Sequence, residues 1–394
     1  MKSFRICFYL VMAVCFFAAR ITGERVLFLL FFMQCFLLLC ALMLNLWTFF
    51  SFSFVQDISA QSSVKGTTPT LKIGIYNDKP FPFTLMRVKV KTAQLNETCV
   101  LSFNLSPKNH IYFDVPLYCA YRGVYDVGMT TLDVNDIFGL LHLRFDLRRL
   151  PYYRLKKLTI YPRLLVPPFL PARLRDTKLF GGGSMRLSDE GESFSDLRAY
   201  RPGDPSKRIH WKVSAGKREL LVKSYDTPAE NAAMIVIDNG KNGLTGEDAL
   251  FRADLACECA AMIAHYSLRA GYVVSLITAS PDREIKGENP RDFARIYDRL
   301  ATIAFNTGDD VAAKITSLPA SSGVSAVYIV TARRDAPFCA AAARFLAAGQ
   351  SVTCLMPGVT PEESHAARAL MPGVDCIPIA LGSDITQIFD DRGA

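Results

Sequence analysis

The chain has 394 residues, of which 50% are apolar and 21% are charged, and its formal net charge is +8. This length suffices for two or three domains, and the apolar fraction excludes a disordered or collagen-like chain. The charge is unevenly distributed, because residues 1–227 sum to +14 and residues 228–394 to −6.

Two apolar segments open the chain. Residues 6–19 carry no charge, and residues 26–50 form a second uncharged stretch that is long enough to span a bilayer. Arg5 and Arg20 flank the shorter segment and can extend it by reaching the interfaces. Residues 1–55 are therefore predicted to form a transmembrane helical hairpin. A cleaved signal peptide followed by one span is the alternative, but Phe17 stands where cleavage favours a small residue.

The basic part of the chain favours contact with anionic lipid headgroups of the bilayer. It lacks a compact Lys/Arg cluster with interleaved aromatic residues, so nucleic-acid binding is not expected. Positive charges flank the hairpin on both sides and leave its orientation open. Seven of the eleven cysteines lie outside the hairpin, without paired spacing, which favours a reducing compartment. We expect the soluble part to face the cytoplasm at the cell (inner) membrane.

The next region changes from a linker to strands. Residues 56–70 are rich in Ser, Thr and Gly and are predicted to be a linker. Apolar and polar residues then alternate in short runs separated by turn residues, as in Leu71–Ile75 and Leu85–Val90. This period of two predicts a small antiparallel β-sandwich over residues 71–170.

After residue 227 the pattern changes to short apolar runs alternating with amphipathic helices. Met234–Ile237, Tyr272–Thr278 and Ala326–Thr331 are typical of buried strands, and residues 246–270 show a helical period. Such alternation predicts a doubly wound α/β domain over residues 228–394.

The chemistry-bearing motifs are few. Gly181–Ser184 lacks the Gly-Lys-Ser/Thr ending of a phosphate-binding loop, and no dinucleotide fingerprint or nucleophile elbow occurs. We therefore expect neither a catalytic site nor a cofactor. Asp238 ends the first strand of the α/β domain, at the edge where such sheets bind ligands. Mg²⁺ bound there would need further oxygen ligands. The next two alternate positions are Gly240, which has no side-chain oxygen, and Asn242. Asp238 is thus a candidate for a degenerate metal site at most, and capping of the following loop or helix is the plainer interpretation.

Residues 171–227 contain an unusual combination of residue types. A Pro-Gly-Asp-Pro turn with Asp204 at its tip precedes Trp211, the only Trp outside the hairpin, among several cations. Alternating Arg and acidic side chains around one Trp suit either a packed ion-pair network between domains or a recognition surface. Residues 220–225 alternate like an edge strand that joins the α/β sheet.

Residues 191–215 resemble the signature of the bacterial domain of unknown function 58 family of membrane-anchored proteins. The matching positions are Leu197, Arg198, Tyr200, Gly203, Asp204, Ile209, Trp211, Lys212 and Ser214, followed by a Leu-Val-Lys strand at 221–223. Tyr121–Gly128 and Asp136–Leu140 are similar to further elements of that family.

The resemblance implies that the C-terminal domain is von Willebrand factor A-like. It implies as partners a MoxR-type AAA+ ATPase and other membrane or von Willebrand A domain proteins. A metal-ion-dependent adhesion site would read Asp-x-Ser-x-Ser, whereas this chain has Asp238-Asn239-Gly240-Lys241-Asn242. Both hydroxyls are missing, so we expect cation-bridged binding to be lost or weak.

Three functions follow as hypotheses. The first is a non-enzymatic, membrane-anchored scaffold that works with the ATPase in assembling or maturing envelope or other protein complexes. The second is a hydrolase of envelope material that uses Asp204, His210 and nearby arginines, and the third is a metal-dependent adhesion module.

Overall fold

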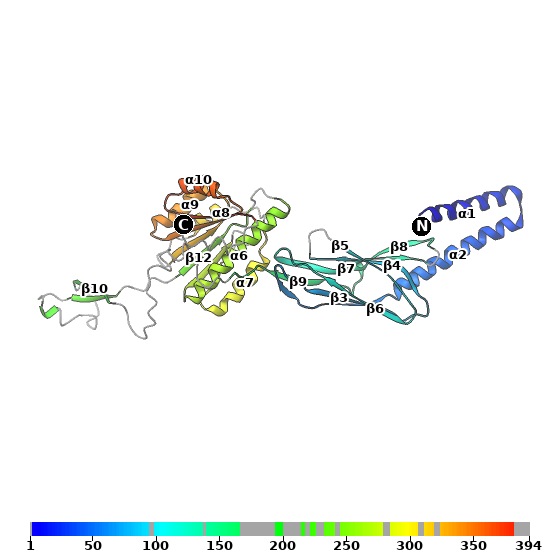
Figure 1. The fold of residues 1–394 in the computed structure, drawn as a ribbon, viewed down its shortest axis with the longest axis horizontal. Coiled ribbons are helices and arrows are strands. Elements are labelled where there is room, and N and C mark those ends of the chain that lie inside the picture. Colours follow the sequence, from blue (N-terminus) through cyan, green and yellow to red (C-terminus); the bar gives the residue numbers. More distant parts are fainter. Residues whose placement is uncertain are drawn as a thin grey trace. The chain divides into compact units, whose positions relative to one another are not determined.

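The computed structural model divides the chain into two compact units, residues 1–161 and residues 162–394 (Figure 1). It describes residues 2–93, 98–136, 139–165, 194–199, 214–216, 221–225, 232–240, 245–278, 284–305, 311–318 and 324–381.

The first unit begins with two apolar helices, α1 (Lys2–Thr22) and α2 (Arg25–Phe50), which lie side by side (Figure 1). Both are long and apolar enough to cross a membrane, and their most apolar windows have mean hydropathies of 1.9 and 2.7. A signal sequence or a core helix of a soluble protein has the same length and composition. However, only 6% of either window is buried, which a core helix would not show.

The open end of this hairpin is attached to the strands that follow. Arg5 of α1 donates a hydrogen bond to the carbonyl of Gly139 at 2.6 Å and another to Asn135 at 3.2 Å. At the end of α2, the ring of Phe49 stacks on Phe145 with centroids 3.9 Å apart. Both ends of the hairpin are thereby fixed to the region around residues 135–145.

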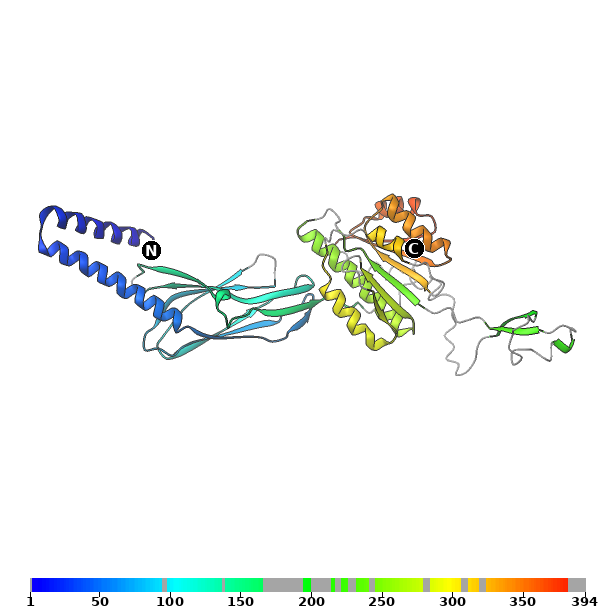
Figure 2. The same ribbon diagram turned by 180° about the vertical axis from the view of Figure 1, so that it is seen from behind.

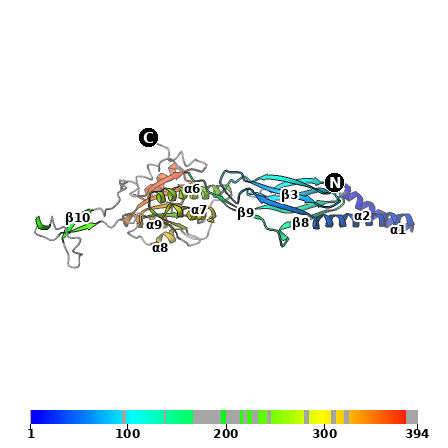
Figure 3. The same ribbon diagram turned by 90° about the horizontal axis from the view of Figure 1, so that it is seen from below.

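Two sheets follow, and their strands run lengthwise through the unit (Figure 3). The smaller sheet has the order β1 (Ser53–Ile58), β3 (Thr70–Asn77), β6 (Asn109–Pro116). The larger has the order β2 (Ser62–Val64), β9 (Lys156–Tyr161), β7 (Gly123–Asn135), β4 (Phe83–Lys91), β5 (Thr98–Leu105), and β8 (His142–Asp146) pairs with β7. A short 3₁₀ helix, η1 (Leu147–Arg149), follows β8.

Alternate side chains of both sheets meet in one apolar core, as the period of two predicts. Leu71, Ile73 and Ile75 of β3 are fully buried, whereas Lys72 between them is exposed. The expectation of a linker at 56–70 was wrong in part, because β1 and β2 lie there and pair with β3 and β9. Ser and Thr are tolerated in these strands because one face of such a sheet is solvated.

The second unit contains a six-stranded sheet that is parallel except at one edge. Its order is β14 (Ile285–Gly287), β13 (Val273–Thr278), β12 (Ala232–Ile237), β15 (Val324–Val330), β16 (Ser351–Pro357), β17 (Asp375–Ile379), with β14 antiparallel to β13. The predicted α/β architecture is confirmed in this coarse form. The sequence did not predict β14.

Helices cover both faces of this sheet (Figure 2). The first face carries α6 (Glu247–Arg269) and α7 (Phe293–Thr302), which follows η3 (Pro290–Asp292). The second carries α8 (Val311–Ser317), α9 (Ala336–Ala347) and α10 (Pro361–Leu370). Along β12, Ile235 and Ile237 face the first set and Met234 and Val236 the second, so the strand is apolar throughout.

The segment after β9 belongs to this second unit. Leu164 and Leu165 pack against its core, and the hydroxyl of Tyr297 donates a hydrogen bond to the carbonyl of Pro162. Arg163 donates a hydrogen bond at 3.2 Å to Glu258, which is fully buried on α6. A buried carboxylate needs such a partner, because its desolvation otherwise costs several kcal/mol.

We expect Arg163→Ala to destabilise the second unit by about 1–3 kcal/mol, because it removes a charged donor from a buried carboxylate. Denaturant unfolding of the detergent-solubilised full chain measures this. Arg291→Ala, at an exposed position on η3, is the control and should change the stability by less than about 0.5 kcal/mol. Equal effects of the two variants would contradict the structural role of the Arg163–Glu258 pair.

Candidate functional site

The candidate site lies where the strand order of the α/β sheet reverses. The chain leaves β12 toward β13 on one side and returns to β15 on the other, so the carboxyl ends of β12 and β15 are neighbours. Asp238 follows the first of these strands and Thr331 the second. Doubly wound sheets bind their ligands at this switch point.

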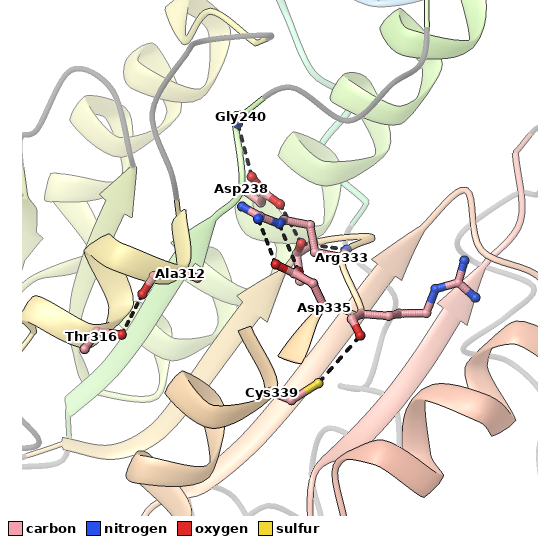
Figure 4. A network of polar contacts seen from close by, with 9 residues as sticks. Asp238, Gly240, Ala312, Thr316, Arg333, Asp335 and Cys339 are labelled. Atoms are coloured by element: carbon pink, nitrogen blue, oxygen red, sulfur yellow. Dashed lines mark hydrogen bonds and ion pairs between the residues drawn. The ribbon is translucent and has the colours of Figure 1, made fainter. Parts of the chain in front are cut away.

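Hydrogen bonds fix the carboxylate of Asp238 at this edge (Figure 4). The hydroxyl of Thr331 donates to Asp238 Oδ2 at 2.6 Å, and the backbone N–H of Gly240 donates to Oδ1 at 3.1 Å. The backbone N–H of Asp238 donates to the carbonyl of Val330 at 2.9 Å. Thr331 is almost fully buried and also accepts a hydrogen bond from the backbone of Arg333 at 3.0 Å. One hydroxyl therefore joins the end of β12 to the loop after β15.

Two ion pairs extend the site beyond Thr331. Arg333 makes two hydrogen bonds to Asp335, at 3.1 and 2.9 Å (Figure 4). Arg334 donates to Glu363 in the first turn of α10 at 3.1 Å. The backbone N–H of Thr360 and the Arg334 guanidinium lower the pKa of the Glu363 carboxyl. Both arginines that follow β15 are thus engaged with carboxylates of the protein.

A third arginine, Arg252 of α6, reaches the same edge. With Asp238, Thr331 and the 333–335 ion pair it lines a cavity of about 460 Å³, whose apolar wall includes Phe305 and Pro357. Burial lowers the pKa of Arg252, against the opposing effect of nearby carboxylates. Its Nε is buried, and no hydrogen bond or ion pair within the described residues involves this side chain.

Gly358 forms the backbone surface against which Arg252 packs. A Cβ at this position would lie 2.9 Å from Arg252 Nε, and its φ of +74° favours glycine. The absence of a side chain at position 358 therefore leaves the space that the guanidinium occupies.

Asp238 is the candidate for a degenerate metal site, and the donors described around it are engaged within the protein. Mg²⁺ requires several oxygen ligands at short distance, often with more than one carboxylate. Asp238 already accepts two hydrogen bonds, and Asp335 is engaged by Arg333. Among the described residues no group of three His, Cys, Asp or Glu side chains is arranged to hold a metal. Asn242, the other expected position, lies outside the described part.

The structure brings none of the described signature residues into the cavity lining. Leu197 and Arg198 lie in β10 (Phe194–Ala199), opposite Lys223 and Val222 of β11 (Leu221–Tyr225). The strand at 221–225 was expected to join the α/β sheet; it pairs with β10 in a separate two-stranded sheet instead.

The remaining signature residues divide into two groups. Ser214 is buried and begins a short helical turn at 214–216. The other signature positions lie outside the described residues: Tyr200, Gly203, Asp204, Ile209, Trp211 and Lys212. His210, the residue on which the hydrolase hypothesis depends, lies outside them as well.

Comparison with protein-family models identifies the region that contains the site. Residues 196–338 match the family described as protein of unknown function DUF58. These residues belong to the DUF58 family. The match confirms the family that the signature had indicated. The DUF58 region includes Asp238, Arg252 and residues 331–335, so most of the cavity lining lies within it.

The other comparisons add no functional information. A search among curated proteins finds no match. Among solved structures, the chain is similar at 9% identity to an exo-β-N-acetylglucosaminidase of family GH20 from Vibrio harveyi, determined with N-acetylglucosamine. The alignment covers 82% of this chain and 59% of that enzyme, and its TM-score of 0.18 is too low to support an argument about fold or activity.

Thr331→Val should destabilise the second unit by about 1–3 kcal/mol, because the half-buried Asp238 carboxylate loses a hydrogen-bond donor while the side-chain shape is kept. Thr331→Ser is the matched control, since it keeps the hydroxyl and loses only a methyl group. Chemical unfolding of the full chain in detergent measures the stability of both variants. If valine were no worse than serine, the hydroxyl bridge would not stabilise the site.

Glu363→Gln should lower stability near neutral pH, because it removes the charge that pairs with Arg334. The pKa of Glu363 is lowered in the folded chain, so its contribution is complete above the ordinary value of 4.5 and is lost as the pH falls through the lowered value. The difference between variant and wild type should therefore be present at about pH 7 and disappear toward about pH 3. Glu362→Gln, on the same helical turn but exposed, should show neither effect. A pH-independent difference would contradict this role.

Proposed function

We propose that the chain is a membrane-anchored scaffold or adaptor, and that its α/β unit binds a soluble protein partner at the switch-point cavity. The observation that carries this proposal is that polar groups in the cavity are paired within the protein or buried. Two of its arginines are paired with carboxylates, and among the described lining residues the one hydroxyl belongs to Thr331, which is 1% exposed. Such fixed, paired groups suit recognition, whereas covalent catalysis needs an accessible nucleophile beside a base.

The apolar hairpin supports the membrane anchor in this proposal. Large side chains on α1 and α2 are exposed over most of both helices, among them Phe32 and Phe36 at 64% and 66%. In water such a surface would be unfavourable, whereas in lipid it is not. All eleven cysteines are free, which supports a cytoplasmic location for the soluble part at the inner membrane.

The resemblance of the signature and the sheet order together support a von Willebrand A-like assignment for the α/β unit. We include in the proposal the partners that this resemblance implies, a MoxR-type AAA+ ATPase and membrane proteins of the von Willebrand A type. Residues 228–394 carry a net charge of −6, which supports electrostatic recognition of such a partner. The two sheets of the first unit, which share one core, support its description as a β-sandwich.

Co-purification tests the scaffold proposal. The tagged full chain in detergent should retain a MoxR-type ATPase from the same source, more strongly with a non-hydrolysable ATP analogue than without nucleotide. Arg334→Gln, in the cavity lining, should reduce retention at least about fivefold, since a charged interface contact contributes on this scale. The exposed control Arg291→Gln should not. Failure to retain the ATPase in every nucleotide state would contradict the proposed partner.

A further inference from the structure

The unpartnered guanidinium of Arg252 distinguishes the switch-point cavity from a set of satisfied ion pairs. Arg333 and Arg334 each have a carboxylate partner, and the charge of Asp238 is stabilised by two hydrogen bonds. Arg252 has no comparable contact among the described residues, although its Nε is buried. Because Arg252 also lines the cavity, an acceptor that enters the cavity could pair with the part of the guanidinium that faces it.

We propose that the switch-point cavity binds a carboxylate side chain of a partner protein, and that Arg252 is the residue that recognises it. This inference rests on the proposed function, because it names the chemistry by which that partner is held. A guanidinium offers parallel N–H donors that match the two oxygens of a carboxylate. The missing side chain at Gly358 leaves the space in which the guanidinium lies, since a Cβ there would be 2.9 Å from Arg252 Nε.

The rest of the cavity favours a carboxylate on an aliphatic stem over inorganic phosphate. Its walls include Ala256, Phe305, Val330 and Pro357, which can contact methylene groups of a Glu or Asp side chain but offer nothing to a free phosphate. Asp238 also faces this cavity, so each additional negative charge on the ligand is repelled. A monoanion with an apolar stem is the best match.

The charges around the site balance in sum, but only two of the three arginines are paired directly. The lining carries three arginines and two aspartates, and Glu363 from α10 balances Arg334 from outside it. The carboxylate groups near Arg252 act on it only at a distance, because none of them makes a hydrogen bond with it. A ligand carboxylate would complete the pairing that Asp335 and Glu363 already provide for Arg333 and Arg334.

Titration with small probes tests the inference on the detergent-solubilised full chain. The probes are N-acetyl-glutamate α-amide, its neutral counterpart N-acetyl-glutamine α-amide, and inorganic phosphate, with binding followed by NMR shifts. The glutamate probe should bind about tenfold or more tightly than the glutamine probe, because one charge-assisted bidentate contact is gained. Arg252→Gln should abolish this preference, Arg252→Lys should retain part of it, and the exposed control Arg291→Gln should leave it unchanged. Unfolding of each variant verifies that it is folded.

Three results would overturn the inference. They are equal binding of the two amino-acid probes, an unchanged preference in Arg252→Gln, and phosphate binding more tightly than the glutamate probe. Failure of the scaffold proposal has a different signature. If the glutamate preference depends on Arg252 but no ATPase is retained, the carboxylate site is supported and the proposed ATPase partner is contradicted. If wild type and Arg252→Gln retain the ATPase equally, the scaffold function is supported and the carboxylate site is contradicted.

Discussion

The hydrogen bond from Thr331 to Asp238 is the contact on which the candidate site depends. It joins the carboxyl ends of β12 and β15, the two strands between which the sheet order reverses. Because the Asp238 carboxylate is held there and the Thr331 hydroxyl also accepts from the Arg333 backbone, the loop after β15 leaves the sheet in a defined direction. That direction places Arg333 and Arg334 beside the carboxylates that pair with them, and it leaves a cavity into which α6 contributes Arg252.

Much of the fold could be predicted from local patterns. The period of two in the first half and the apolar runs alternating with helices in the second reflect which faces of each element are buried. The segment at 56–70 was mispredicted because its Ser and Thr residues suggest a loop, and only the partners β3 and β9 make strands of it. The short strand β14 was missed because its three residues carry too little periodicity.

The site was predictable only in part. Asp238 could be found because it directly follows a recognisable strand at the edge where ligands bind. Arg252 could not be found from the sequence, because the pattern of α6 predicts only which face of the helix is apolar. The space for its guanidinium depends on Gly358, more than a hundred residues later in the chain. Arg334 and Glu363 likewise come from different elements, and a single sequence gives no signal for such a pair.

The central claim is that the chain holds an arginine ready for an external carboxylate, and rotation about the guanidinium Cζ–Nε bond tests it directly. A guanidinium bound by a carboxylate rotates slowly, and an unpaired one rotates fast. In ¹⁵N spectra of the full chain without ligand, we predict slow rotation for Arg333, which is held by Asp335, and fast rotation for Arg252. Slow rotation of Arg252 in the free chain would reveal a partner within the protein and would contradict the account.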